Sequence, residues 1–442
     1  MYRSKLFFSF LLMILPISLI TGPAIPDLTI TLSIFFLLFY LIYNKYINKI
    51  LEFSWFKISL FFWAYLILSS FFAYDIFKSV GESIVFLRFL FIPFLIYFLL
   101  FNSEKNTKIL FLVIFLSVIF VIADCLFQFF NYSSDKGFQQ DLFGYTPDFA
   151  PYNRLTGPFK DLVPGAYVSR FAFIGLVFFH IFIKNIDLRQ IIVIIYLGIC
   201  GYLTYITGER MAFATYGLGL LIYVFFNKKF KRHYLAFSII LMFLLIGLTL
   251  KFHLSFNDFT IKDSSPIELG LIVEKEYKCN FEPSKICKKE VKFQPSFVSI
   301  IENFNLSAYG EIYGLALRMY KDNKIFGIGL NNFKILCEEE KYKKNLINIG
   351  CVTHPHNYYL QWLVETGPIG LILFLIYLIF FLLYILKNNT NYELKLISII
   401  VFVILFWPIM STGSLTKNWL GVSTFYVLGL ILFMHKIKIK FL

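Results

Sequence analysis

Long apolar blocks separated by short polar segments organise this chain. Most blocks are about 17 to 25 residues long, the length of helix that crosses the hydrocarbon core of a bilayer. The pattern predicts about twelve spanning helices. They are placed near residues 6–21, 28–43, 56–74, 84–101, 109–130, 166–183, 190–207, 211–226, 234–252, 356–386, 395–412 and 418–435. The block at 356–386 exceeds one span, so we expect a tilted or interfacial helix that crosses the membrane after Pro368.

The composition agrees with this pattern. Hydrophobic residues make up 58% of the 442 residues and charged residues 15%, and the mean hydropathy is +0.72. The predicted fold class is therefore an all-α polytopic membrane protein, with one large outward loop region that contains short helices. The net charge of +14 would suggest nucleic-acid binding in a soluble protein. Here most Lys and Arg residues fall in short loops on one side of the membrane, so no nucleic-acid partner is predicted.

Charge also orients the predicted spans. Alternate short loops are rich in Lys and Arg, whereas the short loops between them carry only Lys78, Arg210 and Lys417. By the positive-inside rule, both termini are cytoplasmic and residues 131–165 and 253–355 face outward. The expected domains are 1–252 with helices 1–9, the loop 253–355, and 356–442 with helices 10–12. We expect an uncleaved first span, because Thr21-Gly22-Pro23-Ala24 poorly matches a signal-peptide cleavage site.

The cysteines divide into two groups. Cys125 and Cys200 lie inside predicted spans and are expected to be small core residues. Four others lie in the 253–355 loop, which indicates two disulfides in an oxidising compartment. Among three possible connectivities we favour the local pairs, Cys279 with Cys287 and Cys337 with Cys351. Zinc binding is the competing interpretation, but the spacings are not of the CxxC kind.

The end of the large loop carries the candidate chemistry. His354-Pro355-His356-Asn357 opens the span at 356–386. Imidazole is the side chain best suited to exchange protons near neutral pH, and its place at a membrane boundary suggests a substrate that is itself partly lipid. Before it, residues 309–321 are expected to form a helix, and Gly327 and Gly329 are expected to form tight turns that allow a close backbone approach.

Arg88, Arg170 and His180 fall within predicted spans, where charge is costly. No motif surrounds them. We therefore expect them to pair within the membrane, with Asp124 or Glu82 as partners.

Several segments together resemble the O-antigen ligase and O-antigen polymerase superfamily. Residues 318–333 followed by 354–370 resemble its shared domain, Thr207-Gly208-Glu209-Arg210-Met211-Ala212 resembles its outer arginine motif, and 154–159 (RLTGPF) resembles its Arg-x-x-Gly-x-Phe segment. The resemblance covers most of residues 150–390. Glu209 departs from the family, which more often has a small hydroxyl residue there.

The resemblance implies a glycosyltransferase in the bacterial inner membrane, with its active site facing the periplasm. Members move a glycan from undecaprenyl diphosphate to a hydroxyl of lipid A-core, of another repeat unit, or of Ser/Thr. The partners implied are this donor, a hydroxyl acceptor and membrane lipid. No cofactor is implied, because members need no nucleotide sugar and the ligases are described as independent of metal.

Roles for individual residues follow from the chemistry and the resemblance. Arg210 and Arg318 are the candidates for binding the diphosphate, because guanidinium groups bind phosphate oxygens in a bidentate manner and stay charged. His356 matches the family's His-Asn pair and is the candidate general base of an inverting displacement. His354 and Asn357 would orient it or bind sugar. Arg154 is a further candidate for substrate binding.

Alternatives remain within and outside this family. We favour a ligase, but a polymerase or a protein O-oligosaccharyltransferase would use the same residues. A transporter or flippase is the rival of a different class, because twelve spans also suit a carrier. The single large outward loop breaks the two-fold internal repetition that carriers usually show.

Overall fold

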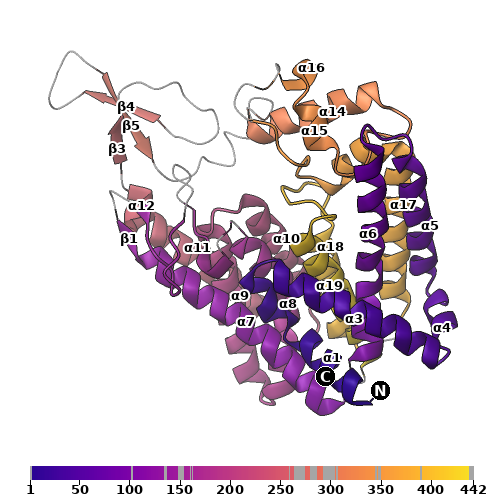
Figure 1. The fold of residues 1–442 in the computed structure, drawn as a ribbon. Helices are drawn as coiled ribbons and strands as arrows, with labels where there is room; N and C mark the ends of the chain where they lie inside the picture. Colours follow the sequence, from indigo (N-terminus) through magenta and orange to yellow (C-terminus); the bar gives the residue numbers. More distant parts are fainter. Residues whose placement is uncertain are drawn as a thin grey trace. The chain divides into compact units, whose positions relative to one another are not determined.

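The computed structural model describes residues 2–100, 103–133, 137–147, 154–159, 161, 163–257, 259–262, 274–278, 286–291, 304, 307–343, 346, 350–388 and 391–437. Within this part of the chain, long helices dominate, and the all-α membrane architecture predicted from the sequence is confirmed (Figure 1). The chain forms two compact units that are built from discontinuous segments. Unit 1 comprises Met1–Phe115, Phe173–Phe182 and Glu311–Leu442, and unit 2 comprises Leu116–Ala172 and Ile183–Gly310. The three domains expected along the sequence remain a prediction.

Unit 1 contains both ends of the chain. Its elements are α1 (Tyr2–Met13), α2 (Leu15–Ser18), η1 (Leu19–Thr21), α3 (Ala24–Tyr43), α4 (Ile47–Leu51), α5 (Ser54–Ser70), α6 (Ile76–Phe94), the π-helical η2 (Leu95–Leu99), α14 (Ala308–Asp322), α15 (Phe333–Cys337), α16 (Glu340–Lys343), α17 (Tyr358–Lys387), α18 (Tyr392–Leu405) and α19 (Asn418–Lys436). Helix α5 packs against α17, and α6 packs against both α5 and α19. Buried aromatic rings, including those of Trp55, Phe94 and Phe381, fill the space among these helices.

Unit 2 contains α9 (Ile186–Ile206), which packs against α10 (Arg210–Phe226) and α11 (Arg232–Phe252). Three helices are divided between the units: α7 (Glu104–Phe130), α8 (Pro164–Phe182) and α14, whose residues before Glu311 belong to unit 2. Shorter elements are β1 (Tyr132–Ser133), β2 (Gly137–Phe138), η3 (Gly157–Phe159) and α12 (Leu254–Asn257). The large loop also forms an antiparallel sheet in the order β3-β5-β4, made of β3 (Phe259–Lys262), β5 (Ile286–Val291) and β4 (Glu274–Lys278). The sequence did not predict this sheet, because its strands are short and mostly polar.

Eight helices among the described residues are long and apolar enough to cross a membrane, or nine if α1 and the α2–η1 segment, bent by 50°, form one span. The shorter apolar helices α5 and α10 also lie at predicted spans. The count of about twelve spans therefore remains a prediction. Some predicted boundaries are wrong. Helix α6 begins at Ile76, well before the start of the span placed at 84–101. Helix α18 ends at Leu405, so the span placed at 395–412 is not helical to its end. Pro408 lacks a backbone N–H and disfavours helical geometry at Trp407, which accounts for the early end.

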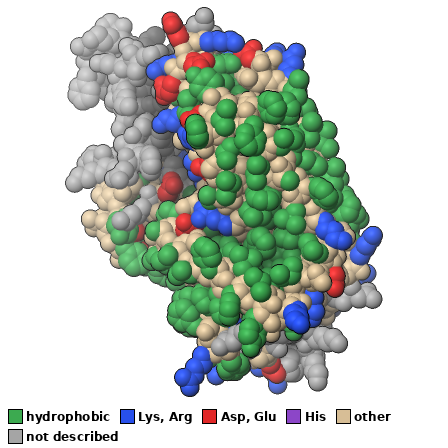
Figure 2. Space-filling view, turned by 45° about the vertical axis from the view of Figure 1, so that its right-hand side comes forward, with side chains coloured by type: hydrophobic (Ala, Val, Ile, Leu, Met, Phe, Trp, Pro, Cys, Tyr) green, Lys and Arg blue, Asp and Glu red, His purple; other side chains and the backbone are tan. Residues whose placement is uncertain are grey.

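The surface fits a lipid environment. Figure 2 shows a broad hydrophobic face, with Lys and Arg side chains mostly toward its upper and lower ends. Large apolar side chains of unit 1 are highly exposed, for example Phe35 at 68% and Phe77 at 93%. An exposed apolar surface of this extent is unfavourable in water and expected against acyl chains.

Two turns that shape unit 1 were predicted from glycine and proline. Gly367 has a φ of 71° inside α17 and, with Pro368 next to it, breaks the helix where the sequence indicated. Gly327 and Gly329 also have positive φ values. A Cβ atom on Gly327 would lie 2.5 Å from the backbone of Glu365. The predicted close approach of backbone at these glycines is confirmed.

Two of the ionisable residues within predicted spans, Arg88 and His180, find partners other than those expected. Arg88 forms an ion pair with Asp27 of α3, with 2.7 Å between Nη1 and Oδ1, and not with Asp124 or Glu82. His180 Nε2 lies 3.3 Å from Glu393 Oε1. These partners come from helices distant in sequence, and residue spacing alone does not show which helices are neighbours.

Candidate functional site

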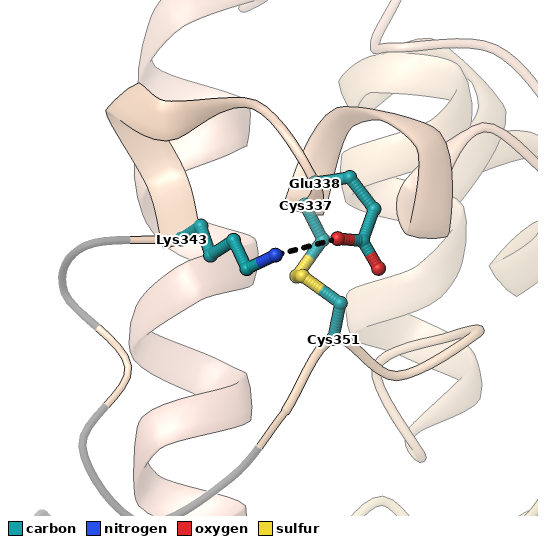
Figure 3. Close-up of a disulfide and its surroundings, with 4 residues drawn as sticks. All are labelled: Cys337, Glu338, Lys343 and Cys351. Carbon is teal, nitrogen blue, oxygen red and sulfur yellow. Dashed lines mark hydrogen bonds and ion pairs between the residues drawn. A yellow bond between two sulfur atoms is a disulfide. The ribbon is translucent and has the colours of Figure 1, made fainter.

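A disulfide anchors the segment that leads to the two histidines. Cys337 at the end of α15 is bonded to Cys351, with 5.6 Å between their Cα atoms (Figure 3). Cys337 is fully buried in a hydrophobic cluster that joins α14, α15 and Val364 of α17. This predicted pair is confirmed, and Cys125 and Cys200 are free and buried as expected. The pair predicted for Cys279 and Cys287 lies outside the residues whose side chains are described.

The two histidines lie together just before α17. The ring centroids of His354 and His356 are 4.2 Å apart. His356 has a φ of 57°, in the left-handed region that few non-glycine residues adopt. Asn357 is the N-cap of α17, and its Oδ1 accepts a hydrogen bond from the N–H of Leu360 at 3.1 Å. A cap of this kind stabilises the first turn of the helix and defines the direction of the chain that enters it. The two predicted site histidines are therefore adjacent.

The connection between α18 and α19, residues 406–417, supports the histidines. The backbone N–H of Thr412 donates to the carbonyl oxygen of His356 at 2.9 Å. Asn357 Nδ2 donates to the carbonyl oxygen of Pro408 at 2.9 Å. The connection was expected to be partly a spanning helix, so its supporting role was missed from the sequence. Pro408 was the available signal that this stretch leaves the helix early.

A buried polar network joins the same connection to α17. Gln361 Nε2 donates to Glu365 Oε2 at 2.9 Å and to Ser414 Oγ at 2.7 Å. The three residues are at most 3% exposed. Because buried polar groups are costly without partners, these bonds restrain the first turns of α17 and the 406–417 connection relative to each other. Sequence reasoning assigned no role to Gln361 or Ser414.

The surroundings keep both imidazoles neutral. Burial lowers the pKa of His354 to about 3, with further lowering by His356 and by the charge of Lys417. Burial also lowers the pKa of His356 below its ordinary value, while a hydrogen bond involving Thr412 acts in the opposite direction. A neutral imidazole can accept a proton, so both residues are in the basic form near pH 7.

Arg318 belongs to the same unit. It lies on α14, whose residues Leu315 and Met319 pack in the hydrophobic cluster of Cys337. Tyr313, also on α14, donates its hydroxyl to the carbonyl oxygen of Met410 at 2.7 Å, so α14 contacts the 406–417 connection as well. The Nε atom of Arg318 is buried, and among the residues that the structure describes, none accepts a hydrogen bond from its N–H.

Unit 2 gathers a second set of charged candidates around Glu209. The charges of Arg154 and Arg170 act on the Glu209 carboxylate, and those of Arg154 and Arg210 act on each other. Arg210, the first residue of α10, has buried Nε and Nη2 atoms without partners among the described residues, as does Arg154 at Nε. Arginines close enough to repel each other, with free N–H groups, suit an anion that neutralises them.

Glu209 has a structural function that the sequence did not reveal. Its two carboxylate oxygens accept hydrogen bonds from the N–H groups of Gly165 and Ala166, at 2.6 and 2.9 Å, in the first turn of α8. A negative charge at a helix N-terminus is favourable. Burial raises the pKa of Glu209 to about 7, and the two hydrogen bonds and nearby arginines oppose this increase. The residue that departs from the family motif thus links the start of α8 to the start of α10.

Comparison with known proteins supports the resemblance seen in the motifs. Residues 192–375 match the family model described as O-antigen ligase. The matched region contains Arg210, Arg318 and the two histidines but not Arg154. A search of curated proteins found no significant match. Within the described residues, no three His, Cys, Asp or Glu side chains gather as a metal site. The match supports the O-antigen ligase superfamily and, with it, an enzyme.

Proposed function

We propose that this protein transfers a glycan from undecaprenyl diphosphate to a hydroxyl of lipid A-core on the periplasmic face of the inner membrane. The family match over residues 192–375 carries the proposal. The multi-pass helical architecture and the two neutral histidines within the matched region support it. The Cys337–Cys351 disulfide is consistent with an oxidising compartment for the loop that leads to these histidines.

His356 is assigned as the general base. The acceptor oxygen attacks the anomeric carbon, its proton passes to the neutral imidazole, and the bond from carbon to the diphosphate oxygen breaks. The electron pair of that bond leaves with undecaprenyl diphosphate. A single displacement inverts the anomeric centre and forms no covalent sugar–enzyme intermediate. His356 suits this role better than His354, whose pKa is lowered to about 3, because a base needs a pKa nearer the working pH.

The arginines are assigned to the leaving group. Negative charge develops on the diphosphate as the bond breaks, and fixed cations stabilise it more in the transition state than in the ground state. Arg210 is supported by its buried, unpartnered Nε and Nη2 atoms and Arg318 by its unpartnered Nε, among the described residues. Arg154 is assigned to substrate binding, and its charge would favour an anion near Arg210. Asn357 and His354 would orient His356 or contact sugar.

Transfer by the purified protein tests this function. Lipid-linked glycan and lipid A-core are supplied in nanodiscs without metal or nucleotide, and release of undecaprenyl diphosphate is measured with and without the acceptor. Acceptor-dependent release, with glycan of inverted configuration on lipid A-core, is the expected result. Lengthening of the donor glycan without transfer to lipid A-core would replace the ligase by a polymerase. Transfer with retained configuration would refute the single displacement.

A further inference from the structure

A groove in unit 1 has a chemistry that the glycan transfer does not use. It has a volume of about 680 Å³ and is formed by residues of α6, the start of α19 and Pro23 before α3. Three cationic side chains line it, those of Lys78, Arg88 and Lys417, together with one carboxylate, that of Glu82.

The cations of the groove are unusual in position. The predicted topology places only three Lys or Arg residues in outward short loops, and Lys78 and Lys417 are two of them. The structure places Lys78 in the first turn of α6 and Lys417 just before α19. The positive-inside rule disfavours cations on this side. Because two of these disfavoured cations line one groove, we expect them to have a function there.

These cations are also largely uncommitted. Among the described residues, neither Lys78 nor Lys417 forms an ion pair. Within the described part of the chain, the Lys417 side chain makes one hydrogen bond, from Nζ to Asn331 Oδ1 at 3.4 Å. Arg88 is held in place by Asp27 and by a 2.6 Å hydrogen bond to Asn418 Oδ1. Its buried Nε has no hydrogen-bond partner among the residues that the structure describes. The groove thus offers ammonium and guanidinium donors to an anion.

The apolar walls of the groove indicate that this anion belongs to a lipid. Phe77 and Val85 line the groove and are 93% and 46% exposed. Trp419 also lines it and donates its indole N–H to the carbonyl oxygen of Leu19 at 2.8 Å. Aromatic side chains that combine an apolar ring with a polar contact are typical of the membrane–water interface. Exposed apolar residues beside cations suit acyl chains below a charged headgroup.

We propose that this groove binds the phosphodiester headgroup of an anionic glycerophospholipid in the outer leaflet. A phosphodiester carries one negative charge. Three cations, partly offset by Glu82 in the groove and by Asp27 beside Arg88, suit that charge better than the larger charge of a diphosphate. Glu82, whose Oε1 accepts a hydrogen bond from Asn331 at 2.7 Å, can accept another from a headgroup hydroxyl. None of the residues assigned to transfer lines the groove, although the charge of Lys417 acts on His354.

Lipid binding by the full-length protein tests the proposal. The probe is phosphatidylglycerol, titrated into detergent-purified protein, and the dissociation constant of the first bound lipid is measured by native mass spectrometry. The groove variant is Lys78→Gln/Lys417→Gln, which leaves the Arg88–Asp27 ion pair intact. The matched control is Lys321→Gln/Lys324→Gln, which removes two exposed lysines outside the groove. A thermal melt of each variant verifies folding.

The expected result is phosphatidylglycerol binding that is weaker by about 10- to 30-fold in the groove variant, since each lysine near a membrane surface contributes about 1 kcal/mol. The control variant should bind as the wild type does, and phosphatidylcholine binding should be equal in all three proteins. Equal loss in both variants would mean nonspecific attraction and would overturn the proposal. Displacement by inorganic phosphate at millimolar concentration would overturn it and assign the groove to free anions. Preferential binding of undecaprenyl diphosphate would overturn it and assign the groove to the lipid carrier of the donor.

Discussion

Breaking the Cys337–Cys351 disulfide should loosen the backbone that leads to the catalytic candidates. The bond closes a loop with a sequence separation of 14 residues, and Cys351 precedes His354 by three positions. A closed loop of about 15 residues restricts the unfolded chain by about 3 kcal/mol at 25 °C. Local opening of this segment should therefore become easier by up to about 100-fold when the bond is reduced.

Hydrogen exchange of the amides in residues 350–357 measures this opening. Wild-type protein is compared in the oxidised and reduced states, which keeps both sulfur atoms and so avoids the packing change of a Cys337→Ala substitution. Exchange should accelerate on reduction in this segment and not in the core of α5 and α6. The rate of glycan transfer should also fall on reduction, because His356 loses its restrained position.

Two controls make the result interpretable. The Cys337→Ala/Cys351→Ala variant should exchange rapidly with or without reductant. A Cys125→Ala/Cys200→Ala variant lacks the thiols that are free among the described residues and should respond to reductant as the wild type does. Equal exchange in oxidised and reduced wild type would refute the reasoning, because the hydrophobic cluster alone would then hold the segment.

Three further predictions follow from the site. Gln361→Met preserves the side-chain volume but removes two buried hydrogen bonds. It should lower the free energy of unfolding, measured by denaturant melts, by about 2 to 4 kcal/mol. A loss below about 0.5 kcal/mol would show that the network is dispensable. The pKa of His356 is lowered, so its basic form persists as the pH falls. The acidic limb of the pH profile of kcat/KM should therefore have its inflection below pH 6.5, the ordinary pKa of His. An inflection above pH 6.5 would contradict the assignment of His356 as the base. Glu209→Ala should destabilise the start of α8 by about 2 to 4 kcal/mol, as measured by thermal melts. Glu209→Gln should destabilise it by less, because the amide retains one hydrogen-bond acceptor. Equal effects of the two substitutions would mean that Glu209 does not act through its two hydrogen bonds.

Much of the local structure could be predicted from the sequence, because it depends on nearby residues. Apolar block length predicted helices such as α9 and α11, and the Gly367-Pro368 pair predicted the break in α17. The Cys337–Cys351 pair was also predictable, because local pairing and an outward loop favoured it. The family resemblance rested on short motifs and is supported by the match over 192–375.

The supports of the candidate site were not predictable in the same way. Gln361 looks like an ordinary helix residue until Ser414, 53 positions away, is placed beside it. The partner of Arg88 is Asp27, because α3 packs against α6. No local sequence pattern indicates that these two helices are neighbours. Glu209 stood out only as a departure from a motif, and its hydrogen bonds to the start of α8 became visible only in three dimensions.

The most direct test of the account is single-turnover glycan transfer by the His356→Gln variant. Wild type, His354→Gln and His356→Gln are compared in identical nanodiscs, with donor binding measured separately. The account predicts that His356→Gln binds donor normally and loses about 100- to 10,000-fold in the rate of transfer, the usual contribution of a general base. Transfer by His356→Gln at a rate near that of the wild type, with normal donor binding, would contradict it.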